Sequence, residues 1–294
     1  MGQRRVAMSR GEGPRGLVER AREFAKGGIP PAVPRDAATV ILLRQAPDLQ
    51  AFLLRRTRAL EFAPGACVFP GGSVDERDAD PAIGETAWAG PAPADLGERL
   101  GISADRARGL VCAAVRETFE ESGVLLAGPS PADLVRDGAA LARDRRRLLD
   151  GSVSFGDLLG RRGLVLRADL LTPWARWITP EVSPRRFDTW FFAAALPPGQ
   201  LAALAVATGS AAQPGTGESD SGTWLRPGAA LEAARAGHIT LLPPTAVTLA
   251  ELGAHQDVAS ILAQRRTITP LLPRVIVEEE QAWLAMPQTV HYPL

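Results

Sequence analysis

Residues 116–124 read RETFEESGV, and this stretch decides the fold because it places three carboxylates within five residues at the end of an apolar helical run. A helix turns by about 100° per residue, so Glu117, Glu120 and Glu121 share one face and one turn. Carboxylates this close repel one another and raise one another's pKa unless a cation lies among them. Oxygen ligands suit a hard divalent ion such as Mg²⁺. The alternative is a solvated helix face, which charge runs commonly form.

Three further features favour a site over a solvated face. Apolar residues at 110–115 and Phe119 anchor the predicted helix, which we place at 104–122, on a core. Gly123 stands where a C-cap glycine belongs, and the apolar run 124–126 follows it. Upstream, residues 69–72 read FPGG, a glycine pair after an aromatic-proline turn.

These residues resemble the second half of the Nudix box, G-x5-E-x7-R-E-U-x-E-E-x-G-U, in which U is a bulky aliphatic residue. Gly72 matches the opening glycine, and Thr118 departs from the first U. The matching residues of the closing half are Arg116, Glu117, Glu120, Glu121, Gly123 and Val124. In patches, the resemblance covers residues 36 to 255.

The first half of the box is interrupted. The family pattern has thirteen residues between its first glycine and its arginine, whereas this chain has forty-three between Gly72 and Arg116. The additional residues fall in a segment rich in Pro, Ala and Gly, at about 78–106, which we predict to be a loop with a short helix. The first-half glutamate has no unique counterpart, and the nearest acids are Asp75, Glu76 and Asp78.

A similar interruption occurs in the Nudix branch of the peroxisomal coenzyme A diphosphatases and their bacterial relatives. Segments 61–72, 177–180, 185–192 and 241–245 also resemble that branch. Coenzyme A-specific members often carry LLTxR[SA]x3Rx3Gx3FPGG. Here the residues that fit are Arg56, Gly65 and 69–72, whereas Leu54 replaces the threonine and Glu61 the second arginine.

The resemblance implies a set of functional residues. The Gly72 carbonyl and the carboxylates of Glu117, Glu120 and Glu121 are the expected ligands of Mg²⁺ or Mn²⁺. Arg116 would hold a neighbouring carboxylate, and Glu120 or Glu121 would act as general base. Glu218 matches the position of another acid near the metals in several members; a solvated loop residue is the alternative.

Substrate binding is expected to involve arginines. Arg56 is a candidate phosphate contact or a sheet-edge residue, and Arg185 and Arg186 adjoin an aromatic strand. Neighbouring strand positions face opposite sides, so one of that pair would contact phosphate. The residues Trp177, Trp190 and Trp224 are either base-stacking platforms or core residues.

Composition restricts the function class. The 294 residues include 33 basic and 33 acidic side chains, so no net field would hold a nucleic-acid backbone. No apolar stretch reaches the length of a membrane span, and Cys67 and Cys112 lie in apolar contexts typical of buried thiols. We therefore expect a cytoplasmic protein with no nucleic-acid or membrane partner, and the Nudix resemblance implies a small-molecule nucleoside diphosphate derivative as substrate.

Together these observations predict an α/β protein with a Nudix-type α/β/α sandwich and a mixed sheet. We expect an N-terminal extension at 1–34, a domain at 35–265 with insertions at about 78–106 and 129–165, and a C-terminal extension at 266–294. The C-terminal extension is a candidate homodimer contact. The expected activity is that of a Mg²⁺-dependent diphosphatase, with coenzyme A or acyl-CoA as leading substrate. The alternatives are a nucleotide-sugar, dinucleotide or NADH diphosphatase, and a non-catalytic nucleotide sensor.

Overall fold

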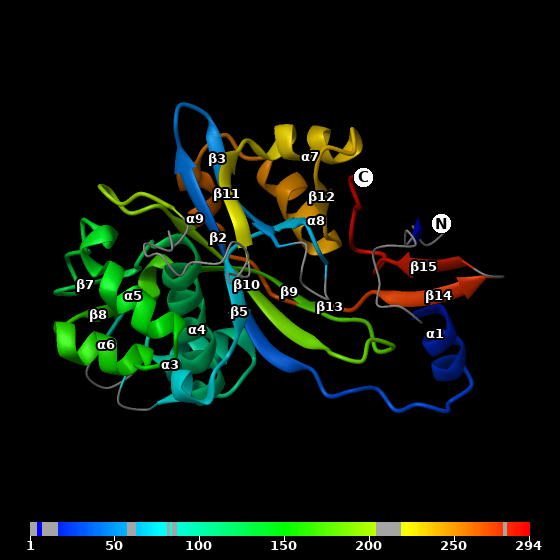
Figure 1. Cartoon of the computed structure of the whole chain (residues 1–294), viewed down its shortest axis with the longest axis horizontal. Helices are drawn as coiled ribbons and strands as arrows, with labels where there is room; N and C mark the ends of the chain where they lie inside the picture. Colours follow the sequence, from blue (N-terminus) through cyan, green and yellow to red (C-terminus); the bar gives the residue numbers. More distant parts are fainter. Residues whose placement is uncertain are drawn as a thin grey trace, which may run out of the picture.

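The computed structural model describes residues 5–7, 17–57, 63–80, 83, 87–203, 219–278 and 281–294. Within these ranges, a mixed sheet of nine strands forms the middle of the molecule (Figure 1). The strands are β2 (Arg35–Gln45), β3 (Leu49–Arg56), β4 (Ala66–Val68), β5 (Gly71–Ser73), β9 (Thr172–Ile178), β10 (Phe187–Ala195), β11 (Ser219–Leu225), β12 (Thr240–Leu241) and β13 (Pro270–Leu271). The main path is β12-β4-β3-β2-β10-β9-β13, and β5 and β11 pair with β2 and β3.

Strand β2 shows why this sheet lies between two layers. Its residues alternate between two separate cores: Val40 and Leu42 join one, and Ile41 and Leu43 join the other, with all four side chains fully buried. Strand β10 runs parallel to β2, with Trp190 opposite Ala38. A strand covered on both faces reads as a nearly continuous apolar run, which is the pattern at both positions.

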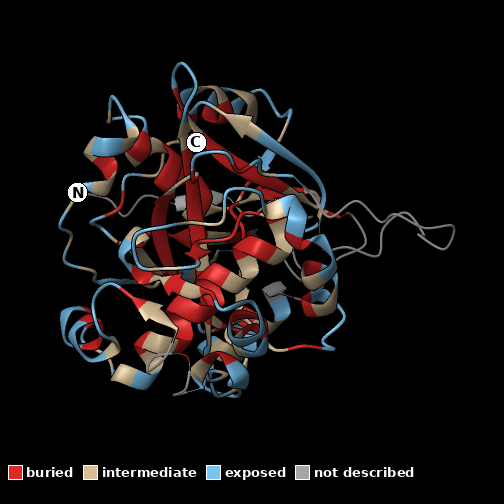
Figure 2. Cartoon of the chain, turned by 90° about the vertical axis from the view of Figure 1, so that its left-hand side faces the viewer, coloured by how far each residue is buried: buried red, intermediate tan, exposed pale blue. Residues whose placement is uncertain are grey.

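Helices cover each face, which confirms the predicted α/β/α sandwich. One layer contains α3 (Pro93–Leu100), α4 (Ala104–Ser122), α5 (Ala142–Leu149) and α6 (Phe155–Arg162). The other contains α7 (Pro227–Arg235), α8 (Pro243–Leu252) and α9 (Val258–Leu262). Figure 2 shows the buried sheet in the interior, with the exposed sides of helices facing outward. Cys67 and Cys112 are buried free thiols, as predicted.

The first insertion pairs with the strand that follows the second insertion. The first contributes β6 (Trp88–Ala89) and α3, and the second contributes α5 and α6 and leads into β8 (Val165–Arg167). Strand β8 lies between β6 and β7 (Ala127–Gly128), which directly follows the motif helix. The predicted short helix of the first insertion is therefore confirmed as α3, and the insertion is structured around it.

The chain termini form a separate small sheet at one end of the molecule (Figure 1). Strand β15 (Gln281–Ala285) pairs with β14 (Arg274–Glu278) and β1 (Arg5–Ala7), and α1 (Leu17–Ala25) packs beside them through Ala21 and Phe24. Strand β13, in the predicted C-terminal extension, pairs with β9 of the central sheet. The proposed domain boundaries and the homodimer contact stay predictions. None of the helices in the described ranges has the length and apolarity needed to cross a membrane.

A partly buried ionic network fixes the first turn of α4 to the sheet. Arg106 donates to both carboxylate oxygens of Asp36 on β2 and to Asp188 on β10, at 2.6 to 3.1 Å. Arg176 on β9 donates to both oxygens of Asp188 at 2.8 and 2.6 Å and stacks over Trp190 at 4.7 Å. The orientation of α4 on the sheet is therefore set at its N-terminal end.

Candidate metal-binding and catalytic site

Helix α4 has the predicted span and both of its end signals. At its start, the Ser103 side chain accepts a hydrogen bond from the Arg106 backbone N–H at 3.3 Å. At its end, Gly123 has φ 74°, a left-handed conformation that glycine adopts without a steric penalty. Between these ends, the helix buries an apolar face that includes Leu110, Val115 and Phe119. The acidic last turns are therefore held on a rigid, buried element.

Arg116 contacts several carboxylates around the acidic group, which consists of Glu117, Glu120 and Glu121. Its guanidinium donates to Asp78 through Nε at 2.9 Å and Nη2 at 2.8 Å. It also donates to Glu117 at 2.8 Å, to Glu120 at 3.2 Å and to the Ser73 carbonyl at 2.9 Å. The Asp78 side chain is 1% exposed and that of Arg116 is 12% exposed. The expectation that Arg116 pairs with neighbouring carboxylates is confirmed.

Asp78 is the acid that sequence reasoning left unassigned. It lies in a 3-10 turn, η1 (Glu76–Ala79), where its carboxylate accepts from the Asp75 backbone N–H at 2.8 Å and from Arg116. Five residues separate it from Gly72, which is the G-x5-E spacing of the box with aspartate in place of glutamate. Counting this spacing alone, without requiring glutamate, would have selected Asp78.

The glycine pair lies directly against the carboxylates. A Cβ atom on Gly72 would overlap the Glu117 carboxylate, and one on Gly71 would overlap the backbone of Ala38 and Thr39. The Gly71 N–H donates to Glu121 Oε2 at 2.7 Å. Glycine is therefore required here for close approach, and the turn brings backbone next to two of the three predicted glutamate ligands.

Burial makes this group electrostatically unusual. It raises the pKa of Glu117 to about 7, with Glu120 adding to the rise and Arg116 opposing it. Burial also raises the pKa of Glu120, against the effect of Arg116. The Arg116 guanidinium forms ion pairs with Asp78, Glu117 and Glu120, so three carboxylates share one positive charge. A divalent cation would neutralise the excess of negative charge, and the oxygen donors are those such an ion takes.

The carboxylates do not yet converge on one point. Within the described ranges, no three Asp, Glu, His or Cys side chains are grouped so as to hold an ion as they stand. Glu117 and Glu120 are engaged by Arg116, and Glu121 by the Gly71 N–H. Ion binding would therefore require these carboxylates to exchange their present hydrogen bonds for the cation, while Asp78 keeps its hold on Arg116.

The predicted substrate-binding arginines differ in their surroundings. Arg56 lies two positions after Leu54 on β3, which places it on the sheet face that α4 covers. Its buried Nε has no hydrogen-bond partner within the described ranges. Arg185 is exposed just before β10. Arg186 is buried and donates to the backbone carbonyls of Thr179 at 3.0 Å and Ala32 at 2.7 Å. It therefore holds two backbone segments together. Glu218 lies outside the described residues.

The tryptophans are packing residues. Trp177 and Trp190 are 4% and 1% exposed and belong to the two cores. Trp224 is partly exposed, but Arg44 lies over its ring at 4.4 Å and Phe52 packs against it at 5.2 Å between centroids. Trp177 and Trp190 are therefore core residues, the second of the two alternatives given for them.

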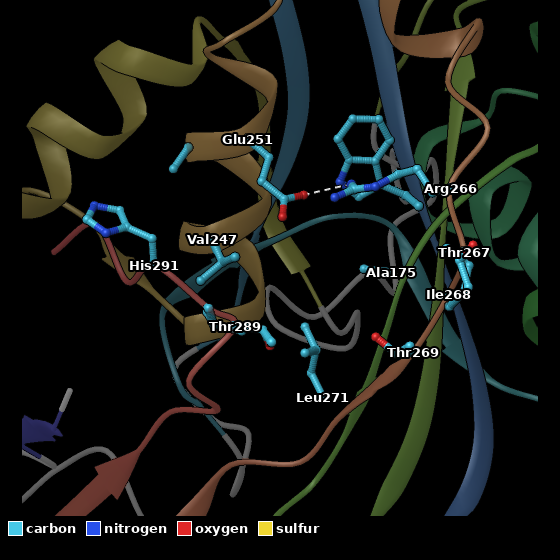
Figure 3. A pocket seen from close by; sticks show the side chains of 13 residues that line it. Ala175, Val247, Glu251, Arg266, Thr267, Ile268, Thr269, Leu271, Thr289 and His291 are labelled. Carbon is cyan, nitrogen blue, oxygen red and sulfur yellow. Dashed lines mark hydrogen bonds and ion pairs between the residues drawn. The ribbon is translucent and has the colours of Figure 1, made fainter. Parts of the chain in front are cut away.

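A cavity of about 390 Å³ lies on the other side of the sheet, between α8, β9, β13 and the C-terminal tail (Figure 3). Glu251 and Arg266 face each other there at 2.8 Å, and Arg266 also stacks over Trp174 at 4.2 Å. Most of its apolar lining belongs to the core shared with α7 to α9, whereas Ile268 packs against the other core. Neither the acidic group nor a predicted substrate arginine lines this cavity.

A central mixed sheet between two helical layers, with this carboxylate helix placed against a Gly-Gly turn, defines a Nudix domain. The family model described as the NUDT19 Nudix domain matches residues 101–252, just over half of the chain, and the chain belongs to this family. A solved NUDIX hydrolase from Alicyclobacillus acidocaldarius has 25% sequence identity and a TM-score of 0.64, covering 80% of this chain and 98% of that one.

Two curated relatives match at similar identity. The acyl-coenzyme A diphosphatase NUDT19 of Gallus gallus is 31% identical over 207 residues, covering 54% of each chain. The putative nudix hydrolase 7 of Caenorhabditis elegans is 30% identical over 225 residues, covering 76% of this chain and 62% of its own length. The chain thus spans between about half and three fifths of the length of these relatives.

Proposed function

We propose that this protein is a divalent-metal-dependent hydrolase of diphosphate linkages, with coenzyme A or acyl-CoA as its leading substrate. The observation that carries the proposal is the buried acidic group on α4, in which Glu117, Glu120 and Glu121 lie against the Gly71-Gly72 turn. Burying such a group is costly unless a cation compensates it. The names of the NUDT19 relatives support acyl-CoA as the substrate class.

In this proposal, the Gly72 carbonyl and the three glutamates hold Mg²⁺ or Mn²⁺. When bound there, the ion would supply positive charge against the diphosphate oxygens and would lower the pKa of the attacking water. Arg116, fixed by Asp78, orients Glu117 and Glu120. Glu120 or Glu121 takes the proton from the water. The water oxygen bonds to one phosphorus, the bridging P–O bond breaks, and the products are a monophosphate and a phosphorylated remainder.

The other predicted residues have secondary places in this proposal. Arg56, on the sheet face covered by α4, is the better candidate for contacting substrate phosphate. Arg185 is a second candidate because it is exposed. Arg186 is omitted from this role, since its guanidinium is committed to backbone carbonyls. Glu218 as an additional metal ligand and a cytoplasmic location stay predictions.

Two alternatives remain distinct in their chemistry. A nucleotide-sugar, dinucleotide or NADH diphosphatase would use the same acidic group, and the departures from the coenzyme A motif at Leu54 and Glu61 favour testing it. A nucleotide sensor without activity would have no need of Arg116 together with all three glutamates. The complete set, with three carboxylates sharing the Arg116 charge in a partly buried position, therefore favours hydrolysis.

Replacement of single glutamates tests the reaction class. We expect Glu120→Gln and Glu121→Gln to lower kcat by about two to four orders of magnitude, with a melting temperature close to that of the unmodified protein. Glu98→Gln, an exposed substitution on neighbouring α3, is the matched control and should keep full turnover. Near-normal turnover in both site variants would refute the assignment of the acidic group.

A substrate panel tests the finer proposal. Coenzyme A, acyl-CoAs, NADH, ADP-ribose and nucleotide sugars would be incubated with Mg²⁺ or Mn²⁺ and their products separated by chromatography. We expect release of 3′,5′-ADP from coenzyme A or acyl-CoA. Cleavage of another member alone would select the first alternative, and binding without cleavage of any member would select the sensor.

A further inference from the structure

A buried arginine from the second insertion contacts the end of the carboxylate helix. Arg145 lies on α5 and is 8% exposed. Its Nε donates to the backbone carbonyl of Glu120 at 2.9 Å, and its Nη1 donates to the carbonyl of Ala203 at 3.2 Å. Its Nη2 is buried and has no hydrogen-bond partner among the residues that the structure describes. This side chain reaches the backbone of a proposed metal ligand from a part of the chain that the uninterrupted motif does not include.

The contact supplies a hydrogen-bond donor at the C-terminal end of α4. The last four carbonyls of a helix lack partners within the helix, so each needs another donor. The Phe119 carbonyl accepts from the Gly123 N–H at 2.9 Å, and the Ser122 carbonyl accepts from the Ala203 N–H at 2.8 Å. Arg145 supplies the donor for Glu120. The guanidinium therefore links the last turn of α4 to the segment at Ala203, and its two arms fix both.

The surroundings are shaped for this side chain. A Cβ atom on Gly123 would lie 3.0 Å from Arg145 Nη1, and one on Gly138 would overlap the Gly123 carbonyl. Among the described residues, no carboxylate forms an ion pair with Arg145, although Glu120 and Glu121 are close enough to act on its charge. Burial of a guanidinium without an ionic partner is costly, so packing alone does not account for an arginine here.

We propose that Arg145 is a positioning residue, which sets the last turn of α4 and thereby the placement of the Glu120 and Glu121 carboxylates. This inference rests on the proposed function. A forked side chain that holds two carbonyls restrains the helix end in a way that a single donor does not. Small displacements of catalytic groups cost up to about 100-fold in rate, and the second insertion would thus contribute directly to turnover.

The test compares Arg145→Met and Arg145→Lys with Arg146→Met, an exposed control on the same helix. Steady-state kinetics would give kcat and KM separately, normalised to the folded fraction, and Mn²⁺ binding to the substrate-free protein would be followed by electron paramagnetic resonance. We expect Arg145→Met to lower kcat by about 10- to 100-fold with KM little changed. Arg145→Lys should recover part of the loss, and the control should behave as the unmodified protein.

Mn²⁺ binding separates positioning from simple electrostatics. Removing a positive charge beside carboxylates would by itself tighten cation binding. Loss of positioning would weaken it, in Arg145→Lys as well as in Arg145→Met. Equal or tighter Mn²⁺ binding by Arg145→Met, or unchanged kcat per folded molecule, would overturn the proposal. If Glu120→Gln also keeps full turnover, the proposed function itself fails; if Glu120→Gln is inactive, only the role of Arg145 is refuted.

Discussion

Substitution of Asp78 by asparagine is the sharpest perturbation that the structure suggests. The change keeps the shape of the side chain and removes its negative charge from a position that is 1% exposed. Arg116 would then lose its doubly hydrogen-bonded partner. Removing one member of a buried ion pair costs about 3–5 kcal/mol. Because Glu117 and Glu120 still face Arg116, we expect the lower end, about 3 kcal/mol.

This loss should appear in both stability and activity. At about 2–4 °C per kcal/mol for a chain of this size class, the melting temperature should fall by roughly 6 °C or more. The freed Arg116 would hold Glu117 and Glu120 more strongly, so a higher Mg²⁺ concentration should be needed for half-maximal turnover. Differential scanning calorimetry and a Mg²⁺ titration of turnover measure the two effects.

Two further variants serve as controls for Asp78→Asn. Glu76→Ala removes an exposed acid from the same turn and should change neither quantity. Asp78→Glu restores the carboxylate of the family pattern and should keep the Mg²⁺ requirement near normal, at a packing cost of about 1–3 kcal/mol. If Asp78→Asn melts with the unmodified protein and needs no additional Mg²⁺, Asp78 is not the partner that holds Arg116 in place.

Two more predictions concern pH and the ionic network. Burial raises the pKa of Glu117 from 4.5 to about 7, so the folded protein holds this proton up to a higher pH than the unfolded chain does. The metal-free protein should therefore lose stability as pH rises from 5 to 8. In thermal melts, Glu117→Gln should make this loss smaller. Burial alone would raise the pKa of Asp188, but hydrogen bonds from Arg176 and Arg106 lower it overall, so its contribution is lost only as pH falls through that lowered value. Asp188→Asn should cost about 3 kcal/mol in urea unfolding at neutral pH, because two partly buried guanidinium groups lose a shared partner that is itself buried. An unchanged unfolding midpoint would contradict this account of the network.

The parts of the fold governed by local patterns could be predicted from the sequence. The motif helix has the predicted bounds, 104–122, because a Ser cap, an apolar periodicity and a C-cap glycine all indicate the same element. The β2–β3 hairpin and strands β9 and β10 follow from apolar runs separated by turn residues. The pairing of β6 with β8 could not be predicted, because such short strands carry almost no periodicity and depend on contacts between distant segments.

In the candidate site, too, local patterns could be predicted from the sequence, whereas contacts between distant segments could not. The acids on α4 were identified because three of them share a turn, whereas Asp78 was left among three candidates because its only local signal is a spacing from Gly72. Arg186 was a candidate phosphate contact because strand alternation predicts the face to which a side chain points, but not which groups its guanidinium contacts. The carbonyls of Ala32 and Thr179 that occupy it come from distant or irregular segments. Arg145 had no sequence signal beyond an arginine-rich helix.

The small sheet in which β8 lies between β6 and β7 constrains any attempt to shorten the chain. Cutting the interrupted motif back to its uninterrupted length would delete β6 and leave one edge of β8 with unpaired backbone groups. Strand β8 follows α5, which carries Arg145, and α6, so a deletion in the first segment would also disturb the second. Removing both segments together and closing the gap after Gly128 with a new turn would avoid the unpaired edge, but it would also remove the Arg145 contact with the Glu120 carbonyl.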